Sequence, residues 1–202
     1  MKNKIHPIHQ GTVLLLLACL FTALCSGCVN LKPTADVTKQ YALGSEAGAL
    51  MLTTEPESVL YIARPNLPGY IEGLHLQYRS ANSEVISLSK ARWIEPLDQG
   101  IARTIGELLL ESGKHTVSGY YPWPQKNRNA AQLKVNFFRF GGSADGQIEL
   151  SAYWELVGAD GEVENQGLFT AKGIEWQVGD AESLVAGLNQ ALVELVLDVG
   201  SL

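Results

Sequence analysis

Cysteine is nearly absent from this chain of 202 residues, and the few cysteines lie at its start. They are Cys19, Cys25 and Cys28, and none follows between residues 29 and 202. A disulfide framework is therefore excluded for the body of the chain, which is long enough to bury a core without one. The clustering of the cysteines indicates a role in N-terminal processing.

Patterns that carry catalysis or metal binding are also missing. Beyond the N-terminal region histidine occurs twice, as His75 and His115, each on an expected strand and without a partner at metal-ligand spacing. The glycine-rich residues 140–146 precede an expected strand, so they predict a turn and not a phosphate cradle. Glu95 and Asp98 are near enough for acid–base work, but at a helix start we expect them to cap and to complement its dipole. We therefore predict no catalytic residue, no metal site, no cofactor other than a covalent lipid, and no enzyme activity.

Positive charge is scarce as well. The chain has 15 Lys and Arg against 21 Asp and Glu. If Lys2 and Lys4 leave with an N-terminal leader, the basic count falls from 15 to 13 and the net charge becomes −8. This balance argues against nucleic acid as a partner and against binding to anionic lipid surfaces.

The N-terminus has the pattern of a secretory signal peptide. A short basic start is followed by an uncharged apolar run over residues 12–24, and then by the small residues Ser26 and Gly27. Such a run is too short to span a bilayer, which takes about 20 residues. We assign residues 1–27 to the signal peptide, residues 28–40 to a lipidated N-terminus with a flexible tether, and residues 41–202 to one domain. The tether reaches at most about 40 Å when extended.

The residues before Cys28 resemble a bacterial lipobox, although Cys25 stands where a leucine is usual. The resemblance implies cleavage between Gly27 and Cys28, a thioether-linked diacylglycerol on Cys28 and an acylated N-terminus. The alternative is an ordinary signal peptide cut at the same bond. Val29 is not aspartate, which by similarity to enterobacterial lipoproteins favours the outer membrane of a Gram-negative bacterium, with the domain facing the periplasm.

Hydrophobic periodicity predicts strands interrupted by one helix and closed by another. The expected strands are 41–44, 59–68, 75–79, 84–93, 114–121, 133–140, 147–156 and 165–176, and the expected helices are 96–112 and 181–199. Both helices have one apolar stripe. We therefore predict a single two-layer α+β domain, with an antiparallel or mixed sheet and two amphipathic helices packed on one face.

Three details of these strands can be checked. Residues 59–63 are apolar on both faces, which predicts a central strand covered on both sides. Pro65 and Pro68 should break its ladder. The apolar phase of strand 133–140 slips between Phe137 and Phe138, which predicts a bulge.

Two proline-stiffened, aromatic segments are candidates for contact with a partner, because Tyr and Trp are enriched in interface cores. They are residues 64–70 (RPNLPGY) and residues 120–124 (YYPWP). The candidate contact residues are Pro65, Leu67, Pro68, Tyr70, Tyr121 and Trp123.

Five short motifs in this order resemble the ABC-type transport auxiliary lipoprotein family, the PqiC-like group. They are Tyr41-Ala42-Leu43, Leu67-Pro68-Gly69-Tyr70, Arg92-Trp93-Ile94-Glu95-Pro96-Leu97, Arg139-Phe140-Gly141-Gly142 and Trp154-Glu155-Leu156. The similarity spans about residues 41–197. The chain departs from the pattern at residues 70–73, which read YIEG where the family commonly has YLDR, and over residues 44–58.

This resemblance implies a non-catalytic lipoprotein that serves an intermembrane lipid transport system. Its partner would be an MCE-domain protein that forms a tube or ring, which the lipoprotein docks to the outer membrane, and the lipoprotein could itself form a homo-oligomeric ring. Two alternatives stay open. One is a periplasmic carrier that binds lipid in a cavity between helices and sheet. The other is a lipoprotein that assembles a different envelope machine, for lipopolysaccharide export or secretion.

Overall fold

The computed structural model describes residues 37–44, 58–113, 115–125 and 129–200. The chain divides into two units, Met1–Asp36 and Val37–Leu202, and all described residues belong to the second. The predicted signal peptide, Cys28 and most of the predicted tether therefore lie outside the described residues.

The described unit contains eight strands and two helices, in the order that the sequence predicts. They are β1 (Lys39–Tyr41), β2 (Ser58–Ile62), β3 (His75–Arg79), β4 (Val85–Trp93), α2 (Leu97–Glu111), β5 (His115–Tyr120), β6 (Ala131–Ser143), β7 (Ile148–Val157), β8 (Val163–Thr170) and α3 (Ala181–Gly200).

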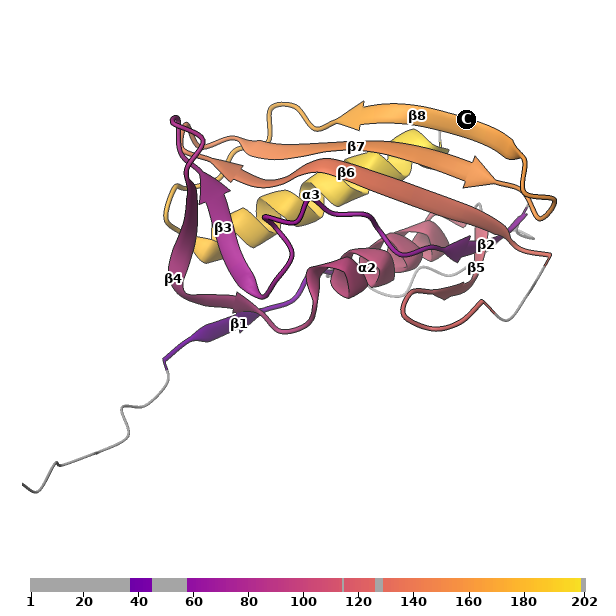
Figure 1. The fold of residues 1–202 in the computed structure, drawn as a ribbon, viewed down its shortest axis with the longest axis horizontal. Coiled ribbons are helices and arrows are strands. Elements are labelled where there is room, and N and C mark those ends of the chain that lie inside the picture. The colour runs from indigo at the N-terminus through magenta and orange to yellow at the C-terminus, as the bar shows by residue number, and fades with distance from the viewer. Residues whose placement is uncertain (1–36, 45–57, 114, 126–128, 201–202) are drawn as a thin grey trace, which may run out of the picture. The chain divides into compact units, whose positions relative to one another are not determined.

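All eight strands form one mixed sheet, with β6 as its longest strand (Figure 1). On one side of β6 the order continues through β7 to β8, with antiparallel pairs. The other edge of β6 is shared by two strands. The start of β6 pairs with β2, which pairs with β5, and the end of β6 pairs with β3, which leads to β4 and β1.

The two prolines explain how one edge of β6 serves two partners. Between β2 and β3 two residues bond to β6. Ala63 N–H donates to Leu133 O at 3.0 Å, and Asn66 donates its N–H to Val135 O and accepts from Phe137 N–H, both at 2.9 Å. Pro65 and Pro68 stand on either side of Asn66 and have no N–H to extend the ladder. β2 ends at Ile62 and not at residue 68, so the predicted interruption is confirmed. After Asn66 the chain leaves the sheet and passes beside the start of α2 before β3 begins.

Both helices pack on one face of the sheet, and their apolar stripes join the strands in one hydrophobic core. The two predicted stripes are buried: Leu97, Ile101, Ile105, Leu108 and Leu109 on α2, and Leu184, Leu188, Ala191, Leu192, Leu195 and Val199 on α3. The α+β prediction is confirmed. β2 has strands on both sides as expected, but Val59 is exposed, because the helices cover only the face that carries Leu60 and Ile62.

Two tryptophan rings pack directly over glycines of the sheet. The Trp176 ring covers Gly142, where an added Cβ would come within 2.5 Å of the ring, and its Nε1 donates to Ser143 O at 3.1 Å. The Trp154 ring covers Gly167 in the same way and donates to Asp198 Oδ2 at 3.0 Å. These contacts give a packing reason for Gly142 and Trp154, which stand in two of the five short motifs noted in the sequence.

The first strand lies earlier than predicted. β1 ends at Tyr41, where the sequence predicted a strand to begin. It pairs in parallel with the end of β4, with Lys39 opposite Ala91 and Tyr41 opposite Trp93. Lys39 and Gln40, which the sequence analysis placed in the tether, are therefore strand residues.

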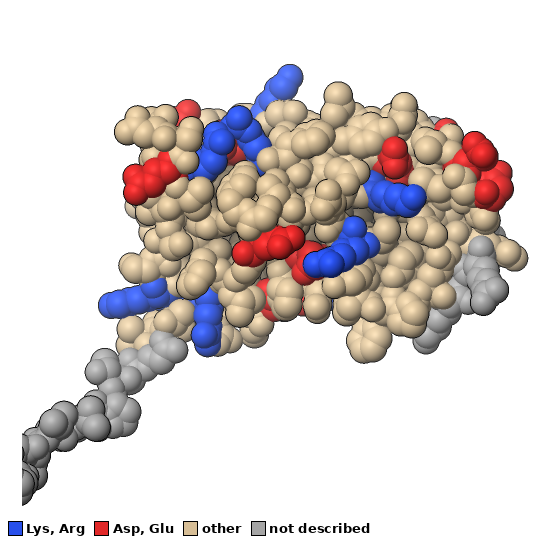
Figure 2. Space-filling model, viewed as in Figure 1, with Lys and Arg blue, Asp and Glu red and all other residues tan. Residues whose placement is uncertain are grey.

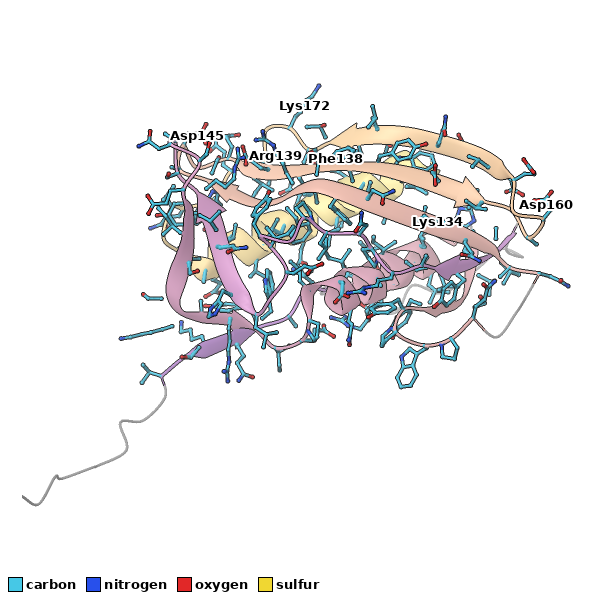
Figure 3. All side chains as sticks on the ribbon, in the orientation of Figure 1. Lys134, Phe138, Arg139, Asp145, Asp160 and Lys172 are labelled. Carbon is cyan, nitrogen blue, oxygen red and sulfur yellow. The ribbon has the colours of Figure 1, made fainter. Side chains whose placement is uncertain are left out.

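The last strands also differ from their predicted ends. β6 runs on to Ser143, because Gly141 and Gly142 continue the ladder with β7. β8 stops at Thr170 and not at residue 176. The predicted bulge is confirmed: the register of β6 shifts between Phe137 and Arg139, which leaves Phe138 exposed on the outer face (Figure 3).

Candidate functional site

The two aromatic segments predicted from the sequence meet at one surface groove beside the start of α2. The groove has a volume of about 450 Å³. It is lined by Arg64, Leu67, Glu72, Gly73, Leu74, Ile94, Pro96, Leu97, Asp98, Gln99 and Tyr121. One wall comes from residues 63–74, the second from the β4–α2 junction, and Tyr121 supplies the third. We call this the α2 groove.

Arg64 joins these walls. Its Nε lies 2.9 Å from Asp98 Oδ2, and its guanidinium lies 5.3 Å from the centroid of the Tyr121 ring. The hydrogen bond that Arg64 donates to Asp98, with the added effect of Tyr121, raises the pKa of Arg64 above its ordinary value. The cation is therefore charged at any physiological pH, and it contacts α2 through Asp98 and the second aromatic segment through Tyr121.

The loop after β5 presents Trp123 to solvent. The Tyr61 hydroxyl donates to Trp123 O at 2.5 Å, and Trp123 N–H donates to Tyr120 O at 3.0 Å, which makes a tight turn. Trp123 is 64% exposed. Burial, with a smaller effect of Tyr121, raises the pKa of Tyr61, so that its hydroxyl keeps the donated proton at neutral pH.

The six candidate contact residues differ in what they can offer a partner. Tyr70 and Trp123 are exposed, and Pro68 and Tyr121 are half-buried. Pro65 and Leu67 are buried and pack within the fold, although Leu67 also lines the groove. A contact role for all six stays a prediction, and their burial favours Tyr70 and Trp123.

Two apolar residues of the groove, Leu74 and Ile94, were not predicted from the sequence. Leu74 directly precedes β3 and Ile94 directly follows β4, and the hydrogen bond from Trp93 N–H to Leu74 O, at 2.7 Å, holds these strand ends together. Leu74 is 43% exposed and Ile94 is 60% exposed, so together they give the groove an apolar rim. Alternation along β4 contained the signal for Ile94: it follows the buried Trp93 and so belongs on the opposite, open side.

Glu95 and Asp98 do not cap α2 as expected. The N-cap position is Pro96, without a side-chain cap. Asp98 binds Arg64, and Glu95 accepts from Arg103 at 2.7 Å. The two carboxylates therefore belong to ion pairs. Asp98 is the one acidic residue in the first turn of α2, so it alone complements the helix dipole there.

Arg103 is the more deeply buried of these cations and holds α2 to the residues after β1. It donates to Glu95, to Glu107 at 3.0 Å and to the carbonyl of Leu43 at 2.7 Å. Burial lowers the pKa of Arg103, but the hydrogen bonds that Arg103 donates to Glu95 and Glu107 outweigh this effect and raise the pKa overall. This network fixes the α2 end of the groove.

The space between helices and sheet is filled by side chains. The hollow there, bordered by Trp93, Phe140 and Leu188 among others, measures about 10 Å³, which is too small for a lipid chain. In the described part of the chain no group of three or more His, Cys, Asp or Glu residues could hold a metal ion. On the face shown in Figure 2, charges of both signs are interspersed over a mostly uncharged surface.

One helix among the described residues, α3, is long and apolar enough to cross a membrane. Half of the relevant window is buried in the domain. Its apolar stripe packs against the sheet, which is the behaviour of a core helix.

Comparison with known proteins agrees with this fold. The family model described as "ABC-type transport auxiliary lipoprotein component" matches residues 41–200. The chain belongs to this family. The match covers the sheet from Tyr41, both helices and the whole α2 groove, so the family resemblance of the five motifs is confirmed.

Solved structures share the fold at low sequence identity. The crystal structure of an uncharacterized protein is 21% identical with a TM-score of 0.63, covering 80% of this chain and 95% of that one. Protein XCC0632 from Xanthomonas campestris is 18% identical with a TM-score of 0.60, covering 80% and 92%. No curated protein matches the chain. The family is thus one of auxiliary lipoproteins of ABC-type transport, and its description names no enzyme activity.

Proposed function

We propose that this lipoprotein is a non-catalytic component of an intermembrane lipid transport system, and that it docks an MCE-domain transport tube to the outer membrane. Family membership supports the transport role. The observation that carries the docking role is the α2 groove, whose rim residues Leu74 and Ile94 expose apolar surface beside fixed charges.

The groove has the composition of a protein-binding site. Its apolar rim can be buried by a partner, and Arg64, Glu72 and Asp98 can set the orientation of that partner. Residues far apart in sequence hold it in shape through the Arg64 and Arg103 contacts. A preformed site of this kind loses little entropy on binding.

The anchor in this proposal is a lipid on Cys28, which would hold the domain at the periplasmic face of the outer membrane. Several acyl chains together give stable attachment. Confinement to a surface raises the effective concentration of the docking sites, so weak groove contacts suffice when many copies act together. A homo-oligomeric ring of the lipoprotein would provide such copies.

The structure favours docking over the carrier alternative. A carrier needs an enclosed apolar cavity, typically of about 300–1,000 Å³. Among the described residues the hollow between helices and sheet holds about 10 Å³, and the larger α2 groove is open to solvent and lined partly by charged side chains. We therefore propose that the partner protein, and not this lipoprotein, carries the lipid.

The test is capture from cells after mild crosslinking. The wild type would be compared with Cys28→Ala and with the double variant Leu74→Glu/Ile94→Glu. Leu197→Glu is the matched control, because Leu197 is an equally exposed apolar residue on α3, at 63% against 60% for Ile94. The intact mass of each captured lipoprotein reports its lipidation.

We expect the wild type and Leu197→Glu to capture an MCE-domain protein and the groove variant to lose most of it. Cys28→Ala should lose the lipid mass and membrane attachment. Capture of lipopolysaccharide-export or secretion proteins in place of an MCE-domain protein would assign the groove to another machine. Stoichiometric co-purified lipid without a captured protein would overturn docking in favour of the carrier.

A further inference from the structure

The outer edge of β8 offers a second surface, away from the α2 groove. β8 is the last strand on its side of the sheet, and in the described part of the chain no strand pairs with its outer edge (Figure 1). We infer that this edge binds an extended segment of a partner protein that alternates apolar and basic residues. The inference does not depend on the proposed function of the groove.

The register of β8 shows which backbone groups point outward. Ala171 N–H donates to Leu150 O at 2.9 Å, so Ala171 directs its N–H toward β7. In an antiparallel ladder, residues that direct their backbone groups toward the neighbouring strand alternate with residues that direct them away. Counting back along the printed register, Thr170, Leu168 and Gln166 direct their N–H and C=O groups away from β7. Three consecutive outward positions form a ready template for an added strand.

The usual protections of a free edge are missing along this stretch. Natural edges carry proline, lysine or a bulge that prevents pairing with other chains. From residue 165 to residue 170, β8 has neither proline nor charge, and the shift in its register lies before this stretch. One outward group is occupied, since Gln166 N–H donates to Asn165 Oδ1 at 2.8 Å, and that exposed bond would exchange for one to the incoming strand.

The outer face of this edge selects apolar side chains. Leu168 is 75% exposed, the highest among the large apolar residues of the described chain. Residues directly opposite each other on paired strands have their side chains on the same face. A partner residue opposite Leu168 would therefore cover it, which favours valine, isoleucine or a similar side chain.

The inner face selects basic side chains. Between β8 and α3 lies an open hollow of about 480 Å³, lined by Leu168, Phe169, Thr170, Lys172, Glu194 and Asp198. Partner residues opposite Phe169 and Gly167 would point toward it. Two carboxylates against one ammonium make the hollow acidic, although Asp198 also accepts from Trp154 Nε1. Lys172, just beyond the end of β8, points away from the sheet (Figure 3).

The test uses the full-length lipoprotein in detergent and a blocked peptide of about nine residues that alternates valine and lysine. Fluorescence anisotropy measures affinity, and hydrogen-exchange mass spectrometry locates the protected amides. A valine–glutamate peptide tests the charge preference. The valine–lysine peptide with alternate N-methyl groups keeps the side chains but cannot form the ladder.

Leu168→Pro is the decisive variant, because it removes an outward N–H and leaves every bond to β7 in place. Leu168→Val is its matched control, which retains the N–H and an apolar side chain that suits a strand. Glu194→Lys tests the acidic hollow without altering the strand, so the proposal stays falsifiable if the proline variant does not fold.

We expect saturable binding of the valine–lysine peptide with protection over residues 163–170. Leu168→Pro should weaken it about tenfold, Leu168→Val should change it little, and Glu194→Lys should reverse the preference between the two peptides. Equal binding of both peptides by the wild type, retained binding by Leu168→Pro, or protection elsewhere would overturn the inference. Self-association that Leu168→Pro abolishes would assign the edge to a second copy of the chain and also overturn it.

Discussion

Arg64 and Asp98 connect two parts of the α2 groove that are far apart in the sequence. Arg64 Nε lies 2.9 Å from Asp98 Oδ2, which joins the proline-containing segment to the first turn of α2. The same guanidinium lies over Tyr121 of the loop after β5. Arg64 therefore links three parts of the groove wall, while Arg103 holds the α2 end.

Replacing Asp98 with asparagine should weaken docking with little change in the melting temperature. Arg64 is largely exposed, so the pair contributes little to folding, but its loss frees Arg64 from the groove wall. Crosslinked capture of the MCE-domain protein should fall several-fold. Glu111→Gln is the control, since it removes one negative charge at the far end of α2. Equal capture by both variants would show that the pair does not shape the site.

Trp123 should dominate the solvent-accessible tryptophan fluorescence. It is 64% exposed, whereas Trp93, Trp154 and Trp176 are at most 5% exposed. Acrylamide should quench a red-shifted component that Trp123→Phe removes. Quenching that persists in Trp123→Phe would mean that another tryptophan is open to solvent.

The Trp123 loop should loosen at high pH. Burial raises the pKa of Tyr61 above its ordinary value of 10.0, and its neutral hydroxyl donates to Trp123 O. The stabilisation is fully present below pH 10 and is lost as the pH rises through the folded pKa. The Trp123 emission should therefore change above pH 10. Tyr61→Phe lacks the hydroxyl, so its emission should be independent of pH in this range, and a retained transition would assign it to another group.

Arg103 should contribute more to stability than Arg139. Arg103→Met leaves the partly buried Glu95 and the carbonyl of Leu43 without their donor, which we expect to cost about 1–3 kcal/mol. Arg139→Met leaves Glu149 paired with Arg79, so its cost should be much smaller. Urea unfolding of both variants measures the difference. Equal losses would contradict the network described around α2.

Gly142→Ala should destabilise the domain by about 1–3 kcal/mol, because the new methyl group would overlap the Trp176 ring. Gly69→Ala is the control, since no atom lies within 4 Å of its added Cβ. Thermal unfolding and the near-ultraviolet circular dichroism of Trp176 report the change. A neutral Gly142→Ala would show that the Trp176 ring is free to move.

The elements of the fold were predictable because their signals are local. The stripes of α2 and α3, the alternation of β7 and the prolines around Asn66 each describe one segment and its covered face. The end of β6 was not predictable, because the sequence around Gly141 and Gly142 is typical of a turn, and only the pairing with β7 shows that both glycines continue the strand. The role of Gly142 depends on Trp176, which comes from a distant part of the chain.

The candidate site was predicted in part for the same reason. Aromatic and proline content indicated the two segments. That Arg64 and Tyr121 belong to one groove follows only from the pairing of β2 with β5, which brings the two segments together. The sequence around Leu74 and Ile94 has no unusual composition that would mark them as site residues. Their exposure depends on the path of residues 63–74 along the edge of β6. Glu95 seemed a capping residue because its partner, Arg103, lies two turns further along α2.

The most direct test of docking is photocrosslinking in growing cells, with a photoreactive amino acid at position 94 in one strain and at position 197 in another. Both positions are exposed to a similar degree, at 60% and 63%, but only the first lies in the α2 groove. The account predicts that position 94 crosslinks to an MCE-domain protein and that position 197 does not. Crosslinks from position 94 to lipid alone, or equal crosslinks from both positions, would contradict it.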